Sequence, residues 1–196
     1  MNVTEIRVVD CVPFENYPFK IQDNSDMKML VDSIKESGVL IPIVVRPKGK
    51  EYEILSGHRR IYACKMSGID KVPAIIRELS REEAVIFMVD SNLHREGLLP
   101  SEKGFAYKMK LEAMKHQGRT SAQVGQKLTS VQALADSSSD SKTQVQRYIR
   151  LTFLEKPLLD LVDEGRIALT PAVELSRLLP EEQRNLIETI ESEDCT

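Results

Sequence analysis

A short basic motif at residues 56–60 has the residue types of an anion-binding site. It consists of Ser56, Gly57, His58, Arg59 and Arg60, at a point where a strand-like stretch gives way to a helix-like one. Glycine lets the backbone approach a ligand closely, and the free N–H groups at the start of a helix bind anions. Adjacent arginines add charge-assisted donors for phosphate. The motif predicts phosphate binding, although an arginine pair on a solvated helix face would have the same sequence.

A second polar cluster follows at residues 91–95 and contains Ser91, Asn92, His94 and Arg95. The carboxamide oxygen of asparagine is a suitable ligand for hydrated Mg²⁺, and Arg95 is a further phosphate donor. The histidines of the two clusters lack the carboxylate or thiolate neighbours of a typical zinc site. Asn92 is therefore the predicted metal-binding residue.

A helix-turn-helix pattern spans about residues 131–154 and predicts DNA binding. The residues expected on its inner face are Leu134 and Ala135 in the first helix and Val145, Tyr148 and Ile149 in the second. The exposed start of the second helix then carries hydrogen-bonding and basic residues suited to base edges and phosphates. These predicted DNA-binding residues are Ser141, Lys142, Thr143, Gln144, Gln146 and Arg147.

Three positions fit this motif poorly. Ser138 and Asp140 are polar where such motifs often have apolar residues, and Ser139 replaces the usual turn glycine. Helix-turn-helix patterns are degenerate, so an ordinary helical hairpin with a solvated face remains an alternative at this point.

The elements that position these motifs divide the chain into two parts. Up to about residue 95, strand and helix patterns alternate, which is typical of a small mixed α/β unit. Beyond it only helical patterns remain. The fold class is therefore α+β, with an N-terminal α/β domain (1–95) followed by an all-helical domain (96–196). The predicted elements of the first part are strands at Glu5–Val9, Ile41–Arg46, Glu51–Leu55 and Val72–Arg77, and helices at Asp26–Ser37, Arg59–Met66 and 80–90.

The composition of the chain indicates its environment and its class of partner. The 196 residues are 41% hydrophobic, and neither a membrane span nor a secretory signal is visible, so no membrane partner is expected. Three scattered cysteines fit a reducing cytoplasm.

The formal net charge is −3, which by itself is weak evidence against nucleic acid as a partner. By segment, however, it is −1 over residues 1–100, +5 over 101–156 and −7 over 157–196. The basic surplus coincides with the helix-turn-helix pattern.

Taken together, these motifs resemble the ParB family of DNA-partition proteins. Their order and spacing carry the resemblance over about residues 6–183. The matching stretches are Leu30–Val39, Pro42–Pro47, Glu53–Ala63, Val72–Ala74 and Asn92–Leu98, followed by the helix-turn-helix.

The resemblance implies a ParB/sulfiredoxin-like nucleotide-binding domain and a helix-turn-helix domain that reads a palindromic, centromere-like site on double-stranded DNA. In the family, cytidine triphosphate (CTP) with Mg²⁺ closes a dimer into a sliding clamp. Ser56, Gly57, His58, Arg59, Arg60, Asn92 and Arg95 correspond to the nucleotide motifs, with Asn92 at the metal. The implied partners are a second copy of the chain and a ParA-type Walker ATPase. The implied location is the cytoplasm, on a nucleoid or plasmid.

Two departures from the family pattern concern catalysis. His58 and Ser91 stand where the family usually has glutamates, and neither is equivalent to a carboxylate base. We therefore expect at most weak CTP hydrolysis. Two alternatives remain from the sequence. One is a transcriptional regulator with the same DNA-binding domain. The other is an enzyme on the same α/β fold, either a nucleotide-dependent kinase or a sulfiredoxin-like protein, although the cysteine that sulfiredoxin needs before the motif histidine is replaced by Gly57.

Overall fold

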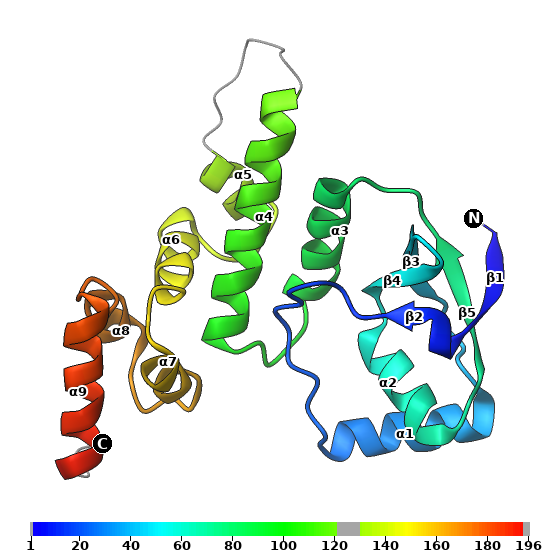
Figure 1. Ribbon diagram of the computed structural model, residues 1–196, viewed down its shortest axis with the longest axis horizontal. Helices are drawn as coiled ribbons and strands as arrows, with labels where there is room; N and C mark the ends of the chain where they lie inside the picture. The colour runs from blue at the N-terminus through cyan, green and yellow to red at the C-terminus, as the bar shows by residue number, and fades with distance from the viewer. Residues whose placement is uncertain (1, 121–129, 194–196) are drawn as a thin grey trace. The chain divides into compact units, whose positions relative to one another are not determined.

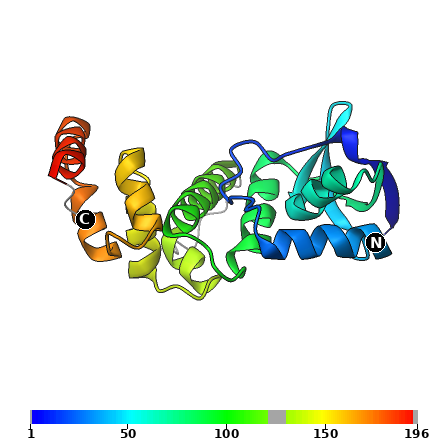
Figure 2. The same cartoon turned by 90° about the horizontal axis from the view of Figure 1, so that it is seen from below.

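The computed structural model describes residues 2–120 and 130–193. These residues form two compact units, 1–92 and 93–196, each of which is described by itself. The first is a mixed α/β unit, and the described part of the second contains only helices (Figures 1 and 2). The predicted fold class is confirmed. No helix in the described ranges is long and apolar enough to cross a membrane.

The first unit is built on a five-stranded mixed sheet with the order β1-β5-β3-β4-β2. β1 pairs with β5 and β3 with β4 in antiparallel fashion, whereas β3 with β5 and β2 with β4 are parallel. The two-residue strand β2 was not predicted, because a run of that length has no detectable alternation. The strands are β1 (Val3–Arg7), β2 (Cys11–Val12), β3 (Ile43–Lys48), β4 (Glu51–Ser56) and β5 (Lys71–Ile76).

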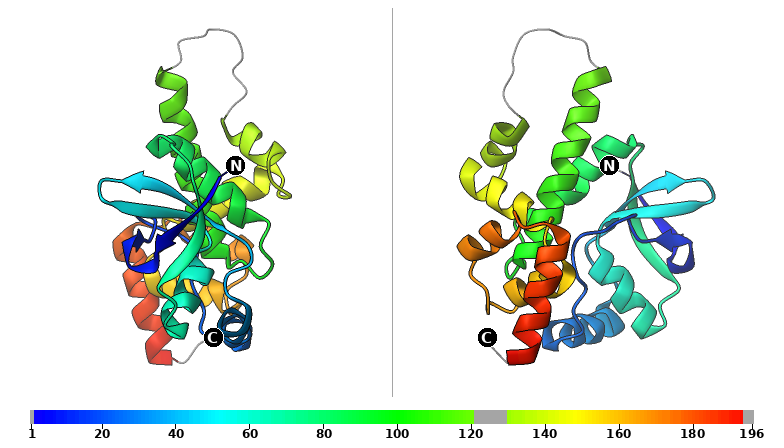
Figure 3. Two further views of the ribbon diagram at one scale, coloured as in Figure 1. Left: turned by 90° about the vertical axis from the view of Figure 1, so that its right-hand side faces the viewer. Right: turned by 60° about the vertical axis from the view of Figure 1, so that its left-hand side comes forward.

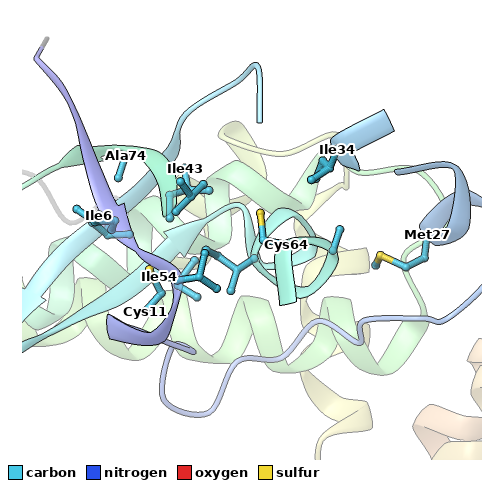
Figure 4. Packing of buried hydrophobic residues seen from close by; sticks show 13 residues of the cluster. Ile6, Cys11, Met27, Ile34, Ile43, Ile54, Cys64 and Ala74 are labelled. Atoms are coloured by element: carbon cyan, nitrogen blue, oxygen red, sulfur yellow. The ribbon is translucent and has the colours of Figure 1, made fainter. Parts of the chain in front are cut away.

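Three α-helices complete this unit: α1 (Ser25–Ser37), α2 (His58–Ser67) and α3 (Arg81–Leu93). A short 3-10 helix, η1 (Val8–Asp10), follows β1 where the sequence predicted a strand to continue to Val9. Asn24 caps α1 by accepting a hydrogen bond from the Met27 amide. α1 and α2 pack together, and their apolar faces join the sheet in one core (Figure 4). Ile43, in the middle of that core, is fully buried. The core fixes the place where β4 ends and α2 begins.

The second unit is organised around the long helix α4 (Pro100–Thr120), against which α5 (Ser130–Asp136) and α6 (Lys142–Leu151) pack (Figure 3). A second cluster of buried leucines joins the end of α6 to α7 (Lys156–Asp163) and α8 (Leu169–Leu175). Residues of α9 (Pro180–Glu193) cover this cluster. These contacts hold α6 against α4 on one side and against α7 and α8 on the other.

Candidate functional site

The junction between β4 and α2 carries the basic motif, and Gly57 determines its geometry. Gly57 precedes the first helical residue with φ +104°, a left-handed conformation that favours glycine. A Cβ at this position would lie 2.6 Å from Cγ2 of the buried Ile43. No side chain caps α2, and the first amides of a helix have no acceptor within it. The start of α2 therefore offers backbone amide donors and the positive end of the helix dipole to an anion.

His58, the first residue of α2, is buried and neutral. Its Nε2 accepts a hydrogen bond from the Phe14 amide (3.3 Å), and its ring stacks on Tyr17 with centroids 3.6 Å apart. Burial lowers the pKa of His58 to about 4, and nearby Glu53 offsets only part of that effect. Because Nε2 is an acceptor, the ring proton resides on Nδ1. That atom is buried and has no hydrogen-bond partner among the described residues.

The two motif arginines differ in their surroundings. Arg59 is half-buried on the first turn of α2, beside Ser56 at the end of β4. Arg60 donates through Nη1 to the backbone carbonyls of Ile41 and Pro42, the latter at 2.7 Å. Arg60 therefore fixes the loop before β3 in this structure, whereas the sequence suggested only a phosphate donor. Its predicted role in phosphate binding stays a prediction.

Asn92 lies in the last turn of α3 and is connected to His58 through Tyr17. The Tyr17 hydroxyl donates to Asn92 Oδ1 (3.2 Å), while Asn92 Nδ2 donates to the carbonyl of Met88 (2.8 Å) and to Ser91 Oγ (3.2 Å). Two motifs that are separated in sequence thus meet at one aromatic ring. Arg95 belongs to the second unit, and its part in the site stays a prediction. In the described ranges, no three His, Cys, Asp or Glu residues form a metal-binding group.

The sequence reasoning missed the segment that covers this junction. We call residues 14–19 the aromatic strap, because buried Phe14 and Phe19 flank the half-buried Tyr17. The chain has five Phe and five Tyr residues, and three of these ten lie in the six positions of the strap. That density was the available signal, but it does not say which helix the aromatic side chains cover.

Behind the strap, buried Glu53 collects three cations. Its Oε2 accepts from Arg46 (2.7 Å), and its Oε1 lies 2.9 Å from Lys48 Nζ and 3.4 Å from Arg81 Nη1. Burial would raise the pKa of Glu53, but hydrogen bonds from Lys48 and Arg46 outweigh it and keep the pKa below its ordinary value. Glu53 also accepts from the Glu15 amide (3.4 Å), which helps to anchor the strap.

The helix-turn-helix region has much of the exposure that its pattern predicts, although Tyr148 and Ile149 of the predicted inner face are only half-buried. Leu134 and Val145 are fully buried on the inner face. Ser141 caps α6 by accepting from the Gln144 amide (3.3 Å). The predicted DNA-binding residues are all exposed at the start of α6: Ser141, Lys142, Thr143, Gln144, Gln146 and Arg147.

Contacts with α4 explain the polar residues of the turn. Asp140 Oδ2 accepts from the buried Tyr107 hydroxyl (2.7 Å) and pairs with Lys103 Nζ (3.0 Å). Lys110 Nζ donates to Ser137 Oγ (2.8 Å), and Ser138 Oγ accepts from the Asp140 amide (3.3 Å). Because these side chains are satisfied, the turn does not need the apolar residues that such motifs often have.

Close packing of α4 against α6 depends on Gly104, which the sequence reasoning also missed. A Cβ on Gly104 would lie 2.5 Å from the Tyr148 carbonyl oxygen and 3.4 Å from Thr152 Cγ2. A glycine inside a helical pattern is itself a signal of close approach. Beside α6, a groove of about 340 Å³ extends to α8 and is lined by Thr143, Gln146, Arg147, Arg150, Thr170, Val173, Glu174 and Arg177.

Comparison with known proteins agrees with these features. The family model described as the ParB N-terminal domain matches residues 1–93. Residues 1–93 therefore form a ParB-like N-terminal domain. The chain is 31% identical over 181 residues to the chromosome-partitioning protein Spo0J of Thermus thermophilus, and 33% identical over 167 residues to stage 0 sporulation protein J of Bacillus subtilis. These alignments cover 92% and 85% of this chain but only 62% and 55% of the two relatives.

One solved ParB structure has a similar fold. The C-terminally truncated chromosome-partitioning protein ParB of Caulobacter crescentus, complexed to the centromeric parS site, matches 98% of this chain and 94% of its own. The TM-score is 0.58 and the identity 21%, which shows the fold alone. A crystal structure of the truncated Caulobacter crescentus ParB with CTP-gamma-S covers 97% of this chain and 99% of its own at 23% identity, with a TM-score of 0.45. The resemblance inferred from the motifs is confirmed.

Proposed function

We propose that this ParB-like chain binds a specific palindromic site on double-stranded DNA as a homodimer and acts in DNA partition. The observation that carries the proposal is the α6 surface, where basic and amide side chains are exposed while Val145 is buried beneath them. Lys142 and Arg147 suit phosphates or guanine edges, and Gln144 and Gln146 suit adenine edges. The +5 charge of residues 101–156 supplies the attraction to the duplex.

The groove between α6 and α8 extends this proposed surface. Thr170, Glu174 and Arg177 of α8 line it together with Gln146 and Arg147 of α6. Arg177 is paired with Glu174 at 3.1 Å. A DNA backbone that follows α6 would meet a second helix carrying hydrogen-bonding groups. A transcriptional regulator would use the same surface, so a role in partition is tested through the DNA site and its neighbourhood.

The test begins with enrichment of genomic fragments on the purified protein, which we expect to yield one palindrome. On that duplex, Arg147→Ala and Lys142→Ala should each weaken binding about 5- to 150-fold at fixed salt, because a lost base or charged phosphate contact costs about 1–3 kcal/mol. Arg184→Ala on α9 is the control, since it removes the same charge outside the proposed surface. Unchanged affinity in both α6 variants would contradict the proposed DNA-binding face.

We also propose that CTP with Mg²⁺ binds at the start of α2 and acts as the switch of a dimeric clamp. Two features of the junction fit an anionic nucleotide. The α2 amides have no acceptor within the helix, and His58 has a buried Nδ1–H without a partner among the described residues. The carboxamide oxygen of Asn92 is a hard ligand of the kind that Mg²⁺ takes, and the bound ion would neutralise phosphate charge. Ser56, Arg59, Arg60 and Arg95 complete the proposed binding set.

Hydrolysis of the nucleotide should be slow or absent. His58 is neutral with Nε2 already accepting from Phe14, and the Ser91 hydroxyl donates to the Met88 carbonyl (2.9 Å). Neither side chain can replace a carboxylate base. Phosphate release from CTP in the presence of the enriched DNA tests this expectation. Robust turnover that persists in Ser91→Ala would overturn it.

Two groups that the enzymatic alternatives would use, Glu53 and Cys64, are poorly suited to that chemistry in the described residues. A kinase needs a carboxylate base, but Glu53, one of the two nearest in sequence to the motifs, is buried among its cations and has a lowered pKa. Sulfiredoxin-like chemistry needs a thiolate, yet Cys64 is buried and burial raises its pKa. DNA binding with a nucleotide switch is therefore the function that this geometry supports best.

A further inference from the structure

The aromatic strap is fixed at both ends and contains a tight turn between them. Phe14 and Phe19 are buried, with 2% and 3% of their surface exposed. Between them the Tyr17 amide donates to the Phe14 carbonyl (3.1 Å), and Asn16 has φ +58°, a left-handed conformation that asparagine tolerates better than most residues. The central turn is thus a small unit that can rearrange while its two anchors stay in place.

Tyr17 reaches both halves of the proposed nucleotide site. Its ring lies against the His58 imidazole with an interplanar angle of 19°, and its edge contacts Phe19 at a centroid distance of 5.4 Å. Its hydroxyl donates to Asn92 Oδ1 at 3.2 Å. One side chain therefore touches the first residue of α2 and the last turn of α3.

The hydrogen bonds of the Asn92 side chain determine which of its atoms could bind a cation. Its Nδ2 is committed to the Met88 carbonyl and to Ser91 Oγ. Oδ1 is the only atom of this side chain that can bind a cation. That oxygen already accepts a hydrogen bond from the Tyr17 hydroxyl. The oxygen has two lone pairs, but a cation bound to one would repel the hydroxyl hydrogen at the other, so the two disfavour each other at this atom.

We propose that Tyr17 is a positioning residue that restrains the nucleotide site in a closed state by occupying the Asn92 oxygen. This inference rests on the proposed function, because it assigns Asn92 to the magnesium of a bound nucleotide. Asn92 Oδ1 would turn to the cation when a magnesium nucleotide is bound, and its hydrogen bond from the Tyr17 hydroxyl would be lost. The turn at Asn16 and Tyr17 then moves, while Phe14 and Phe19 hold the ends of the strap.

Tyr17→Phe tests this restraint, because it keeps the ring on His58 and removes only the hydroxyl. Calorimetric titration of the full chain with CTP in the presence of Mg²⁺ should give a Kd about two- to tenfold lower than that of the wild type, the equivalent of one hydrogen bond. In EDTA the two proteins should bind CTP equally, because no cation then competes for Oδ1. Tyr62→Phe is the matched control. Its hydroxyl makes no hydrogen bond with the described residues, and its affinity should equal that of the wild type.

A second measurement follows the strap without nucleotide. Amide hydrogen exchange over residues 14–19 should be faster in Tyr17→Phe than in the wild type, whereas the core strands should exchange at the same rate in both proteins. Equal magnesium-dependent affinities, or weaker binding by Tyr17→Phe, would overturn the restraint and leave the nucleotide proposal standing. Failure of both proteins to bind CTP with Mg²⁺, alone or with the enriched DNA, would overturn the nucleotide proposal and the restraint together.

Discussion

Acidification from pH 7 to pH 5 should destabilise the first unit through His58. His58 is buried, with 5% of its surface exposed, its Nε2 accepts from the Phe14 amide, and burial lowers its pKa to about 4. In the unfolded chain the same ring titrates near 6.5. Between these two values the unfolded state binds a proton that the folded state does not. The stability that the neutral His58 contributes is therefore fully present above the pKa of the unfolded state. It is lost as the pH falls toward the pKa of the folded state.

The size of the effect follows from the two pKa values. For a folded pKa of about 4 and an unfolded pKa of 6.5, linkage gives a loss of about 2 kcal/mol in the free energy of unfolding between pH 7 and pH 5. Such a loss is a sizeable fraction of the stability of a small domain, which is about 5–15 kcal/mol. It is large enough to separate from experimental error in denaturant titrations.

The assay is urea unfolding of the full chain at both pH values, followed through NMR signals of the first unit. His58→Gln is the comparison, because glutamine can accept from the Phe14 amide but does not titrate. All other titratable groups are present in both proteins, so the comparison isolates the effect of His58 and its interaction with Glu53. The wild type should lose about 2 kcal/mol more than the variant. Equal pH dependence, or an NMR titration of the His58 ring near 6.5, would refute the argument.

Two further predictions concern the packing of α6 on α4. Gly104→Ala places a Cβ against the Tyr148 carbonyl oxygen. Thermal unfolding should show that the free energy of unfolding falls by about 1–3 kcal/mol, as in overpacked cores, and DNA binding should weaken. An unchanged Tm would contradict this close contact. Asp140→Ala leaves the buried Tyr107 hydroxyl and Lys103 without their acceptor and should cost about 1–3 kcal/mol in urea unfolding. Asp140→Asn, which can still accept from Tyr107, should cost less, and equal losses in the two variants would show that the hydroxyl contact is unimportant.

Local patterns in the sequence were sufficient for the three α-helices and four of the five strands of the first unit, and for the motif at the start of α2. Gly57 was expected to permit close backbone approach, and the structure shows the reason in its left-handed φ and in the side chain of Ile43 beside it. The aromatic strap could not be predicted in the same way. Its contacts join Phe14 to His58 and Tyr17 to Asn92, across 44 and 75 residues, and no periodicity within either segment specifies such pairing.

In the helix-turn-helix region, a residue that fits the sequence motif poorly can still make favourable contacts in the tertiary structure. Judged on the turn alone, Asp140 counted against the motif because a charged residue replaced an apolar one. In the fold it is the acceptor for Tyr107 and Lys103 of α4, so the turn is held by polar contacts. The close approach that matters is likewise made by Gly104 of α4. Since α4 lies outside the twenty or so residues of the motif, comparing the motif alone with a consensus underestimates how firmly α6 is positioned to contact DNA.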